Sequence, residues 1–431
     1  MVTDSNNAGS GMAWWVWTLA VVFVVYLFSF QTGYSVVNPS VQQDVGLSIA
    51  QVSTIAAVYT WAFAISQFFG GALLDRLGAR KVLPISIALV TLGIFVFANA
   101  KSYEMLLLSQ VIVALGSCTG FVGAGYIGGQ WFGMAKFSFM FGLVQVMAAL
   151  TSAFSVNLIS LGLDTMTWRT LFNATAVFGV VFFVIGLIYI RNPTPVPSSH
   201  DGSIGQFFLS VVKGLLDVAK IGHVWVAALG GALSFGMLLA LGVVWMPKLL
   251  MVHGLTEGTA SLGTSLVWLG LAAGSAVIPH WSDVIKRRKL PIILGCVVQL
   301  LALVGIIYIP NINSTLALVL CFVLGFANAS HMLAFSTAAD VVQPQQIGTS
   351  AAIVNGIMFI LGGLLISRPG FKIGVGLEKG MEPASLEIAM YASMPLVIAA
   401  AAALIIGLVI RETYPRSNRI EVPPLKEVAE Q

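Results

Sequence analysis

Polar side chains recur inside the long apolar stretches of this 431-residue chain, at spacings that place them on single helix faces. Gln31, Tyr34 and Asn38 stand at i, i+3 and i+7, which aligns them along one side of a helix. Such groups suit reversible hydrogen bonding to a polar solute rather than covalent catalysis. The predicted substrate contacts, with Trp245 as an aromatic wall, are Gln31, Tyr34, Asn38, Tyr126, Gln130, Gln145, Trp245, Asn328, His331 and Asn355.

A histidine inside an apolar stretch can carry a proton, because its side chain titrates near neutral pH. His331 is the only histidine well inside such a stretch. We therefore predict that His331 contacts the solute and carries a proton whose movement is coupled to that of the solute. The alternative interpretation is a neutral His331 bonded to a backbone carbonyl. For the other polar residues the alternative is helix packing, in which each side-chain hydrogen bond contributes roughly 0.6 kcal/mol.

Acidic residues are absent from the middle of every apolar stretch, and all 17 lie in tails, loops or the ends of stretches. A proton relay built on a mid-membrane carboxylate is therefore not available. The sequence contains no His-Glu-x-x-His helix, no Gly-x-Ser-x-Gly turn and no phosphate-binding Gly-Lys-Ser/Thr loop. We expect no enzymatic activity, no cofactor and no metal. Cys118, Cys296 and Cys321 are predicted to serve core packing.

Only 9% of the residues are charged and 58% are apolar, whereas a soluble domain carries about 25% charged residues. Most intervals between successive charges hold one helix of about 20 residues, the length that crosses a hydrocarbon core. These intervals are continuously apolar rather than alternating, which favours helices over barrel strands. The sequence predicts an all-α membrane protein with twelve transmembrane helices, at 14–38, 53–74, 82–100, 105–130, 137–162, 170–190, 223–250, 258–282, 290–309, 315–340, 347–367 and 386–410.

A segment rich in proline and serine, 191–222, separates six spans from six and is predicted to be a cytoplasmic linker. It divides the chain into two pseudo-symmetric six-helix bundles, 14–190 and 223–411, with cytoplasmic tails at 1–13 and 412–431. With both termini in the cytoplasm, fifteen of the 21 Lys and Arg residues also lie there, as the positive-inside rule requires. We therefore expect a multi-pass protein of the cell inner membrane. Basic loops explain the net charge of +4, and no nucleic-acid partner is expected.

The most informative loop joins spans two and three and reads Gly71-Ala-Leu-Leu-Asp75-Arg76-Leu-Gly78-Ala-Arg80-Lys81. It resembles the loop motif of the major facilitator superfamily at every position. A degenerate copy between spans eight and nine aligns Asp283 with Asp75 and Arg288 with Arg80. Matching copies in two halves indicate the internal duplication of this transporter class. An ordinary basic loop would explain the charges but not the repeat.

These loops are predicted to form a gate on the cytoplasmic side. An aspartate at a membrane boundary can accept hydrogen bonds from the exposed amides of a helix N-terminus. The resemblance places span eleven, which begins near Gly348, against the first loop, so Asp75 is expected to cap it. Arg80 and Arg288 are expected to add charge pairs. The predicted gating residues are Gly71, Asp75, Arg76, Gly78, Arg80, Lys81, Asp283, Arg288 and Asp340, the last as the partner of Arg288.

The resemblance implies a secondary carrier of the bacterial nutrient-uptake type, with spans one, four, seven and ten around a central cavity. We expect proton-coupled uptake of a small polar organic solute, a metabolite, carboxylate or siderophore, by a lipid-embedded monomer working by alternating access. Two departures from family patterns are Gln110, where many members carry an arginine, and the absence from 137–162 of the proline found in proton–drug antiporters. The alternatives are an exporter of drugs or siderophores and a transporter-like receptor.

Overall fold

The computed structural model of the chain describes residues 11–193, 204–383 and 385–414. In this part of the chain, twelve helical spans are long and apolar enough to cross a membrane. The predicted all-α fold with twelve transmembrane helices is thereby confirmed. The predicted tails and the linker fall partly outside the described residues.

Each half of the chain contributes six spans, some of which consist of two consecutive helices. The helices of the N-terminal half are α1 (Gly11–Val45), α2 (Ile49–Leu77), α3 (Ala79–Ala98), α4 (Tyr103–Ser117), α5 (Gly120–Phe132), α6 (Phe137–Leu163) and α7 (Trp168–Tyr189). The helices of the C-terminal half are α9 (Gly222–Ala240), α10 (Met246–Val252), α11 (Glu257–Ile285), α12 (Lys289–Tyr308), α13 (Ser314–Asn328), α14 (Leu333–Ala339), α15 (Ile347–Glu378) and α16 (Leu386–Val409).

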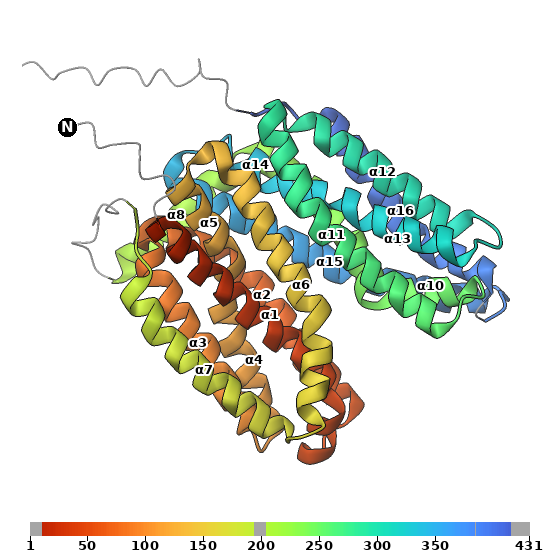
Figure 1. The fold of residues 1–431 in the computed structure, drawn as a ribbon, viewed down its shortest axis with the longest axis horizontal. Helices are drawn as coiled ribbons and strands as arrows, with labels where there is room; N and C mark the ends of the chain where they lie inside the picture. Colours follow the sequence, from red (N-terminus) through yellow and green to blue (C-terminus); the bar gives the residue numbers. More distant parts are fainter. Residues whose placement is uncertain (1–10, 194–203, 384, 415–431) are drawn as a thin grey trace, which may run out of the picture.

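The two halves meet at one end of the molecule and diverge toward the other, as Figure 1 shows. Their contacts run mainly along two helix pairs, α2 with α15 and α6 with α11. We call the end at which they meet the basic end, after Arg76, Lys136 and Arg287 in its loops. The opposite end carries Asp44 and Arg169. The space between the halves is therefore closed at the basic end.

Two helices run well beyond the ends predicted for their spans. α1 continues past 38 to Val45, and α15 continues past 367 through Arg368 to Glu378. Hydropathy marks where a helix leaves lipid, whereas a helix ends only where its backbone hydrogen bonding stops. Helices α1 and α15 therefore extend beyond the approximate spans predicted at 14–38 and 347–367.

A further helix, α8 (Ile204–Ala219), lies inside the predicted linker. It packs against α2 and α15, with Val211 and Val218 buried. Leu209, Val212 and Leu216 are exposed at i, i+3 and i+7, so they form an outward apolar stripe. This amphipathic pattern is typical of a helix lying in the membrane interface. The prediction of a cytoplasmic linker at 191–222 did not include this helix, because the neighbouring prolines and serines dominated the composition.

Three spans are interrupted midway along their length. The fourth span breaks between α4 and α5, the seventh contains a π-helical segment (Leu241–Trp245, η3), and the tenth contains a 3-10 segment (Ala329–Met332, η4). Such segments take backbone carbonyls out of the regular helical ladder and often occur at functional sites. All three spans belong to the set predicted to surround a cavity.

Candidate functional site

A cavity of about 350 Å³ lies between the two halves. Its walls come from α1, α2, α4, α5 and α6 in one half and from α9, η3, α11, η4, α14 and α15 in the other. Among the described residues that line it, none is Asp, Glu, Lys or Arg. The polar lining residues are Gln31, Ser117, Gln145, Ser152, His331 and Asn355. The aromatic ones are Phe28, Phe63, Phe121, Phe235, Trp268, Phe335 and Phe359.

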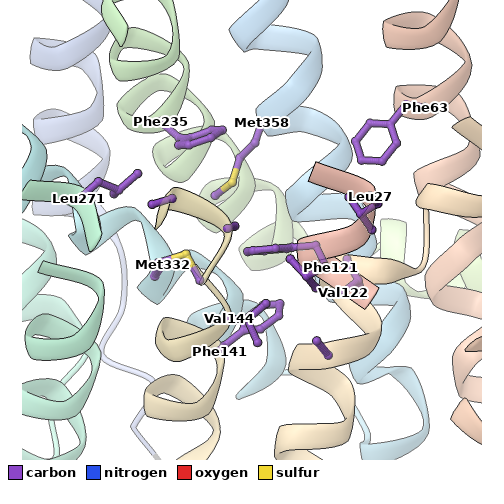
Figure 2. Packing of buried hydrophobic residues seen from close by; sticks show 14 of the residues in the cluster. Leu27, Phe63, Phe121, Val122, Phe141, Val144, Phe235, Leu271, Met332 and Met358 are labelled. Atoms are coloured by element: carbon purple, nitrogen blue, oxygen red, sulfur yellow. The ribbon is translucent and has the colours of Figure 1, made fainter. Parts of the chain in front are cut away.

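Aromatic rings close the cavity toward the basic end. The rings of Phe141 and Phe335 meet edge to face with centroids 4.4 Å apart, and Phe121 lies 5.3 Å from Phe141 and 5.9 Å from Phe335. Figure 2 shows Phe121 and Phe141 within the buried apolar cluster. The hydroxyls of Ser138 and Ser336 form a 2.7 Å hydrogen bond between the halves nearby. A solute in the cavity reaches the basic end only if these contacts separate.

His331 lines the cavity from η4, where the tenth span is interrupted. Its Nδ1 lies 2.8 Å from the carbonyl oxygen of Asn328, and the ring of Phe235 lies 4.7 Å away, centroid to centroid. A neutral imidazole with its proton on Nδ1 fits this contact, because Nδ1–H then donates to the carbonyl. Nε2 is left as a hydrogen-bond acceptor. Sequence analysis gave substrate contact and a bond to a backbone carbonyl as alternative interpretations of His331. In the structure, His331 both lines the cavity and contacts a backbone carbonyl.

Three amide side chains face the cavity from α1, α6 and α15. Gln31 and Gln145 form no hydrogen bond within the described part of the chain. Asn355 donates from Nδ2 to Oε1 of Gln67 on α2, across the junction of the halves, over 3.0 Å. The first two amides are therefore available to a solute, whereas the third also links the halves.

Four of the predicted substrate contacts lie away from the cavity lining. Tyr34 donates its hydroxyl to the carbonyl of Val52 over 3.4 Å, and Asn38 lies further along α1 toward the opposite end. Tyr126 and Gln130 line a separate small pocket at the basic end. None of these four residues lines the cavity.

Two other predicted contacts are engaged inside the C-terminal half. Asn328 is fully buried, and its Nδ2 donates to Ser234 and, over 2.8 Å, to Oε1 of Gln299. Trp245 donates from Nε1 to the carbonyl of Ile366 over 2.7 Å. Neither side chain lines the cavity. Both connect neighbouring helices, which was the packing alternative.

The cavity also contains residues that the sequence did not single out. Trp268 of α11 lines it and donates from Nε1 to the carbonyl of Gly242 in the π-helical segment, over 3.3 Å. Phe63 and Phe235 line it from α2 and α9. A search confined to polar stripes misses such residues, because an aromatic residue in an apolar span does not differ in polarity from its neighbours in the sequence.

Asp75 joins the halves at the basic end, in what we call the first clamp. Its carboxylate accepts from the backbone amides of Gly348 and Thr349 over 2.8 and 2.7 Å, and from the Thr349 hydroxyl over 2.7 Å. These amides belong to the first turn of α15, where they have no partner within the helix. The predicted capping contact between Asp75 and span eleven is confirmed.

Gly71 lies one turn before Asp75 and allows this close approach. A Cβ atom at Gly71 would overlap the carbonyl oxygen of Gly348 and lie 2.5 Å from the Cβ of Ala352. Gly142 is in the same situation on the other helix pair, where a Cβ atom would overlap the carbonyl oxygen of Ser275. Two glycines therefore set the backbone separation between the halves.

Asp283 forms a second clamp on the other helix pair. Its Oδ2 accepts from the backbone amide of Phe139, in the first turn of α6, over 3.2 Å. Its Oδ1 pairs with the buried guanidinium of Arg288, whose Nε bonds Asp340 over 3.2 Å. The predicted pairing of Arg288 with Asp340 is confirmed. The clamp residues thus follow the internal repeat, since Asp75 and Asp283 each reach a helix N-terminus of the other half.

The chain after the last span covers this cluster. Glu412 accepts from the backbone amides of Arg288 and Lys289 over 2.8 and 3.1 Å, at the start of α12. The Thr413 hydroxyl donates to Asp340 over 3.0 Å. Burial raises the pKa of Asp340 to about 6, although the neighbouring Arg288 acts in the opposite direction.

The remaining gating residues occupy the first loop itself. Gly78 adopts a positive φ of 73°, which glycine tolerates and which lets α3 begin directly after α2. Arg76 lies against Gly214 of α8. Arg80 and Lys81 are exposed, and neither forms an ion pair within the described residues. The expected charge pair at Arg80 is therefore wrong there, because its side chain points into solvent.

Replacing Arg288 by Met is expected to lower the thermal midpoint of unfolding. The change leaves Asp340 without its cation, and removing one partner of a buried pair costs about 3–5 kcal/mol. The loss should be larger at pH 7.5 than at pH 5.5, because a buried carboxyl with a raised pKa takes a proton at low pH and is destabilising only when ionised. Thermal unfolding at both pH values measures this. Arg287→Met at the exposed neighbouring position is the control, and equal losses at both pH values would contradict the assignment to Asp340.

Comparison with known proteins identifies the family to which this chain belongs. The sequence profile of the Major Facilitator Superfamily matches residues 18–367. The uncharacterised transporter YybO of Bacillus subtilis (strain 168) is 19% identical over 380 residues, 82% of this chain and 85% of that protein. The probable galactarate/D-glucarate transporter GarP of Escherichia coli (strain K12) is 24% identical over 378 residues, 78% and 83% of the two chains.

Two further similarities extend this result. A probable 4-methylmuconolactone transporter of Cupriavidus pinatubonensis (strain JMP 134 / LMG 1197) is 25% identical over 339 residues, 74% of this chain and 73% of that one. The structure of the proton:xylose symporter XylE superposes with a TM-score of 0.66 at 15% identity and covers 94% of this chain and 97% of its own. The superposition shows the shared twelve-helix fold. With the profile matched over most of its length, this chain is a transporter and not an enzyme, and it belongs to the Major Facilitator Superfamily.

Proposed function

We propose that this chain takes up a small polar organic solute by alternating access, driven by the entry of protons. The observation that carries the proposal is the position of the cavity. It lies between two halves that are joined at the basic end by the two clamps and that diverge toward the opposite end. A carrier that rocks between two such arrangements exposes the same cavity to each side in turn.

The basic end is proposed to face the cytoplasm of a bacterial cell, with both termini inside and the chain in the inner membrane as a monomer. The positive-inside rule supports this orientation, since the loops at Arg76, Lys136 and Arg287 all lie at the basic end. The arrangement described here is then open to the outside. Export and a receptor role would use the same cavity. A deletion strain separates these functions, because uptake predicts lost growth on one nutrient and export predicts gained sensitivity to a compound.

The solute is proposed to be a metabolite, as the names of relatives suggest. Two of these names contain galactarate and D-glucarate, or 4-methylmuconolactone, and the name of the solved structure contains xylose. Coupling to protons is proposed to depend on His331. It is the one titratable side chain of histidine, lysine, arginine or acidic type among the described residues that line the cavity. Protonation at Nε2 would place a charge beside the solute and change its binding.

His331→Ala is expected to abolish net uptake driven by a pH gradient while solute counterflow persists. Exchange of solute for solute needs no net proton movement, so it should persist, although loss of the Nε2 acceptor should weaken solute binding. Uptake and counterflow in proteoliposomes measure the two activities. His253→Ala, at the end of α10 and outside the cavity lining, is the matched control. Net uptake with an unchanged pH dependence in His331→Ala would contradict the coupling role.

A further inference from the structure

We propose that the cavity selects an uncharged ring compound with hydroxyl or amide groups, and that it rejects ionised carboxylates of the same shape. The inference rests on the transport function proposed above and names the class of substrate. It departs from the sugar acids after which several relatives are named.

The first argument is charge. The described lining contains no Lys or Arg to pair with a carboxylate and no Asp or Glu to pair with an ammonium. Lys248 lies outside the lining, above the ring of Trp245 at 4.7 Å. Asp75 and Asp283 are occupied in the clamps. While His331 is neutral, an ion in the cavity would exchange part of its hydration for neutral dipoles alone, which is unfavourable.

The second argument is shape. Flat apolar rings enter the cavity from both halves, and Phe63 of α2 meets Phe359 of α15 edge to face with centroids 4.8 Å apart. Phe235 lies 6.3 Å from Phe359, and Phe121 and Phe335 close the basic end. Aromatic faces bind planar and alicyclic bodies by stacking and edge contacts. A flexible polar chain would leave this surface uncovered.

The third argument is the kind of hydrogen bond that the polar groups require. Gln31 and Gln145 each offer an acceptor and a donor with no partner in the described chain. His331 uses Nδ1 toward Asn328 and offers Nε2 as an acceptor. A hydroxyl or amide donates to that nitrogen. An ionised carboxylate only accepts, so it would face the Nε2 lone pair without a bond.

The test uses a panel of monocyclic and bicyclic compounds in which each ring carries, in turn, a hydroxymethyl, carboxamide, carboxylate or trimethylammonium group. Purified protein in lipid nanodiscs is titrated at pH 8, where carboxylic acids are ionised. Binding is measured by thermal shift and by the fluorescence of Trp268 and the other tryptophans. The hydroxymethyl or carboxamide form of at least one ring is expected to bind about tenfold or more tightly than its carboxylate and ammonium forms.

A variant provides a second readout. Gln145→Lys places a cation in the cavity and is expected to bind the carboxylate form about tenfold more tightly than the wild type does. Ser160→Lys adds the same charge to an exposed position of the same helix and should leave the preference unchanged.

The outcomes separate the substrate class from the transport function. Carboxylate or ammonium forms that bind the wild type as tightly as the neutral forms overturn the proposed class, as does the absence of binding by every neutral form. Counterflow of a carboxylate by the wild type overturns the class and keeps the transport function. A neutral compound that binds but is not exchanged by counterflow overturns the transport function and keeps the class.

Discussion

Asp75→Asn is expected to reduce uptake at least about tenfold while the protein still inserts and folds. The change replaces a carboxylate that accepts three hydrogen bonds from Gly348 and Thr349 by an amide with a single acceptor oxygen. Hydrogen bonds to a charged group contribute about 1.5–3 kcal/mol each. Loss of about 2 kcal/mol from the closed basic end lowers the ratio of closed to open arrangements about thirtyfold. Initial uptake rates in proteoliposomes measure the effect.

Two comparisons assign the loss to the first clamp. Thr349→Ala removes only the hydroxyl donor, so its reduction should be smaller than that of Asp75→Asn. Asp164→Asn changes an exposed carboxylate after α6, outside both clamps, and should transport normally. Wild-type uptake by Asp75→Asn would remove the gating role. Alkylation of a cysteine introduced at Phe121 gives an independent readout, because that position becomes accessible from the basic end only when the clamps open.

Gly71→Val is expected to abolish uptake almost completely by preventing closure of the basic end. The added side chain would overlap the backbone of α15 at Gly348 and crowd Ala352. Overpacking of a tight contact typically costs about 1–3 kcal/mol, and here the halves can relieve it by separating. The variant should therefore rest with its basic end open. Uptake rates and the reactivity of the same introduced cysteine report this state.

Position decides whether the same substitution is tolerated. Gly374→Val on α15 is the matched control, because no heavy atom lies within 4 Å of a Cβ built there. Gly142→Val should behave like Gly71→Val, since it blocks the other helix pair at Ser275. Normal uptake by Gly71→Val would show that the halves do not need this separation.

The number of spans and the division into halves could be predicted because the hydrocarbon core imposes a minimum helix length and excludes charge. The ends of α1 and α15 could not, because helical hydrogen bonding continues beyond Asn38 and through Arg368. α8 was missed for a related reason. Its apolar stripe at Leu209, Val212 and Leu216 is too short and too polar on its other face to register as a span.

The cavity was only partly predictable. Helical spacing contains no information on the depth of a residue between the two ends of the molecule, and of Gln31 and Tyr34 only Gln31 lines the cavity. Asn328 was misassigned because a buried amide satisfied by Gln299 gives the same sequence signal as one that faces a solute. Trp268 needed the three-dimensional structure, since its position depends on the π-helical segment opposite it.

The clamps were predicted better than the cavity. Asp75 lies in a motif whose spacing fixes its place at a helix end, so its contact with Gly348 followed from the resemblance. The pairing of Arg288 with Asp340 followed from charge and topology. Glu412 gave no signal of its own, because a single acidic residue after the last span reads as part of a solvated tail.

Glu412 and Thr413 make the segment directly after the last described span more important than its hydropathy suggests. A premature stop codon directly after Arg411 would spare all twelve spans, yet it would delete the acceptor for the first amides of α12 and a donor to Asp340. Such an allele is expected to encode a less stable protein. It would expose Arg288 and Asp340 to water, and the cell's quality-control proteases would encounter a looser protein.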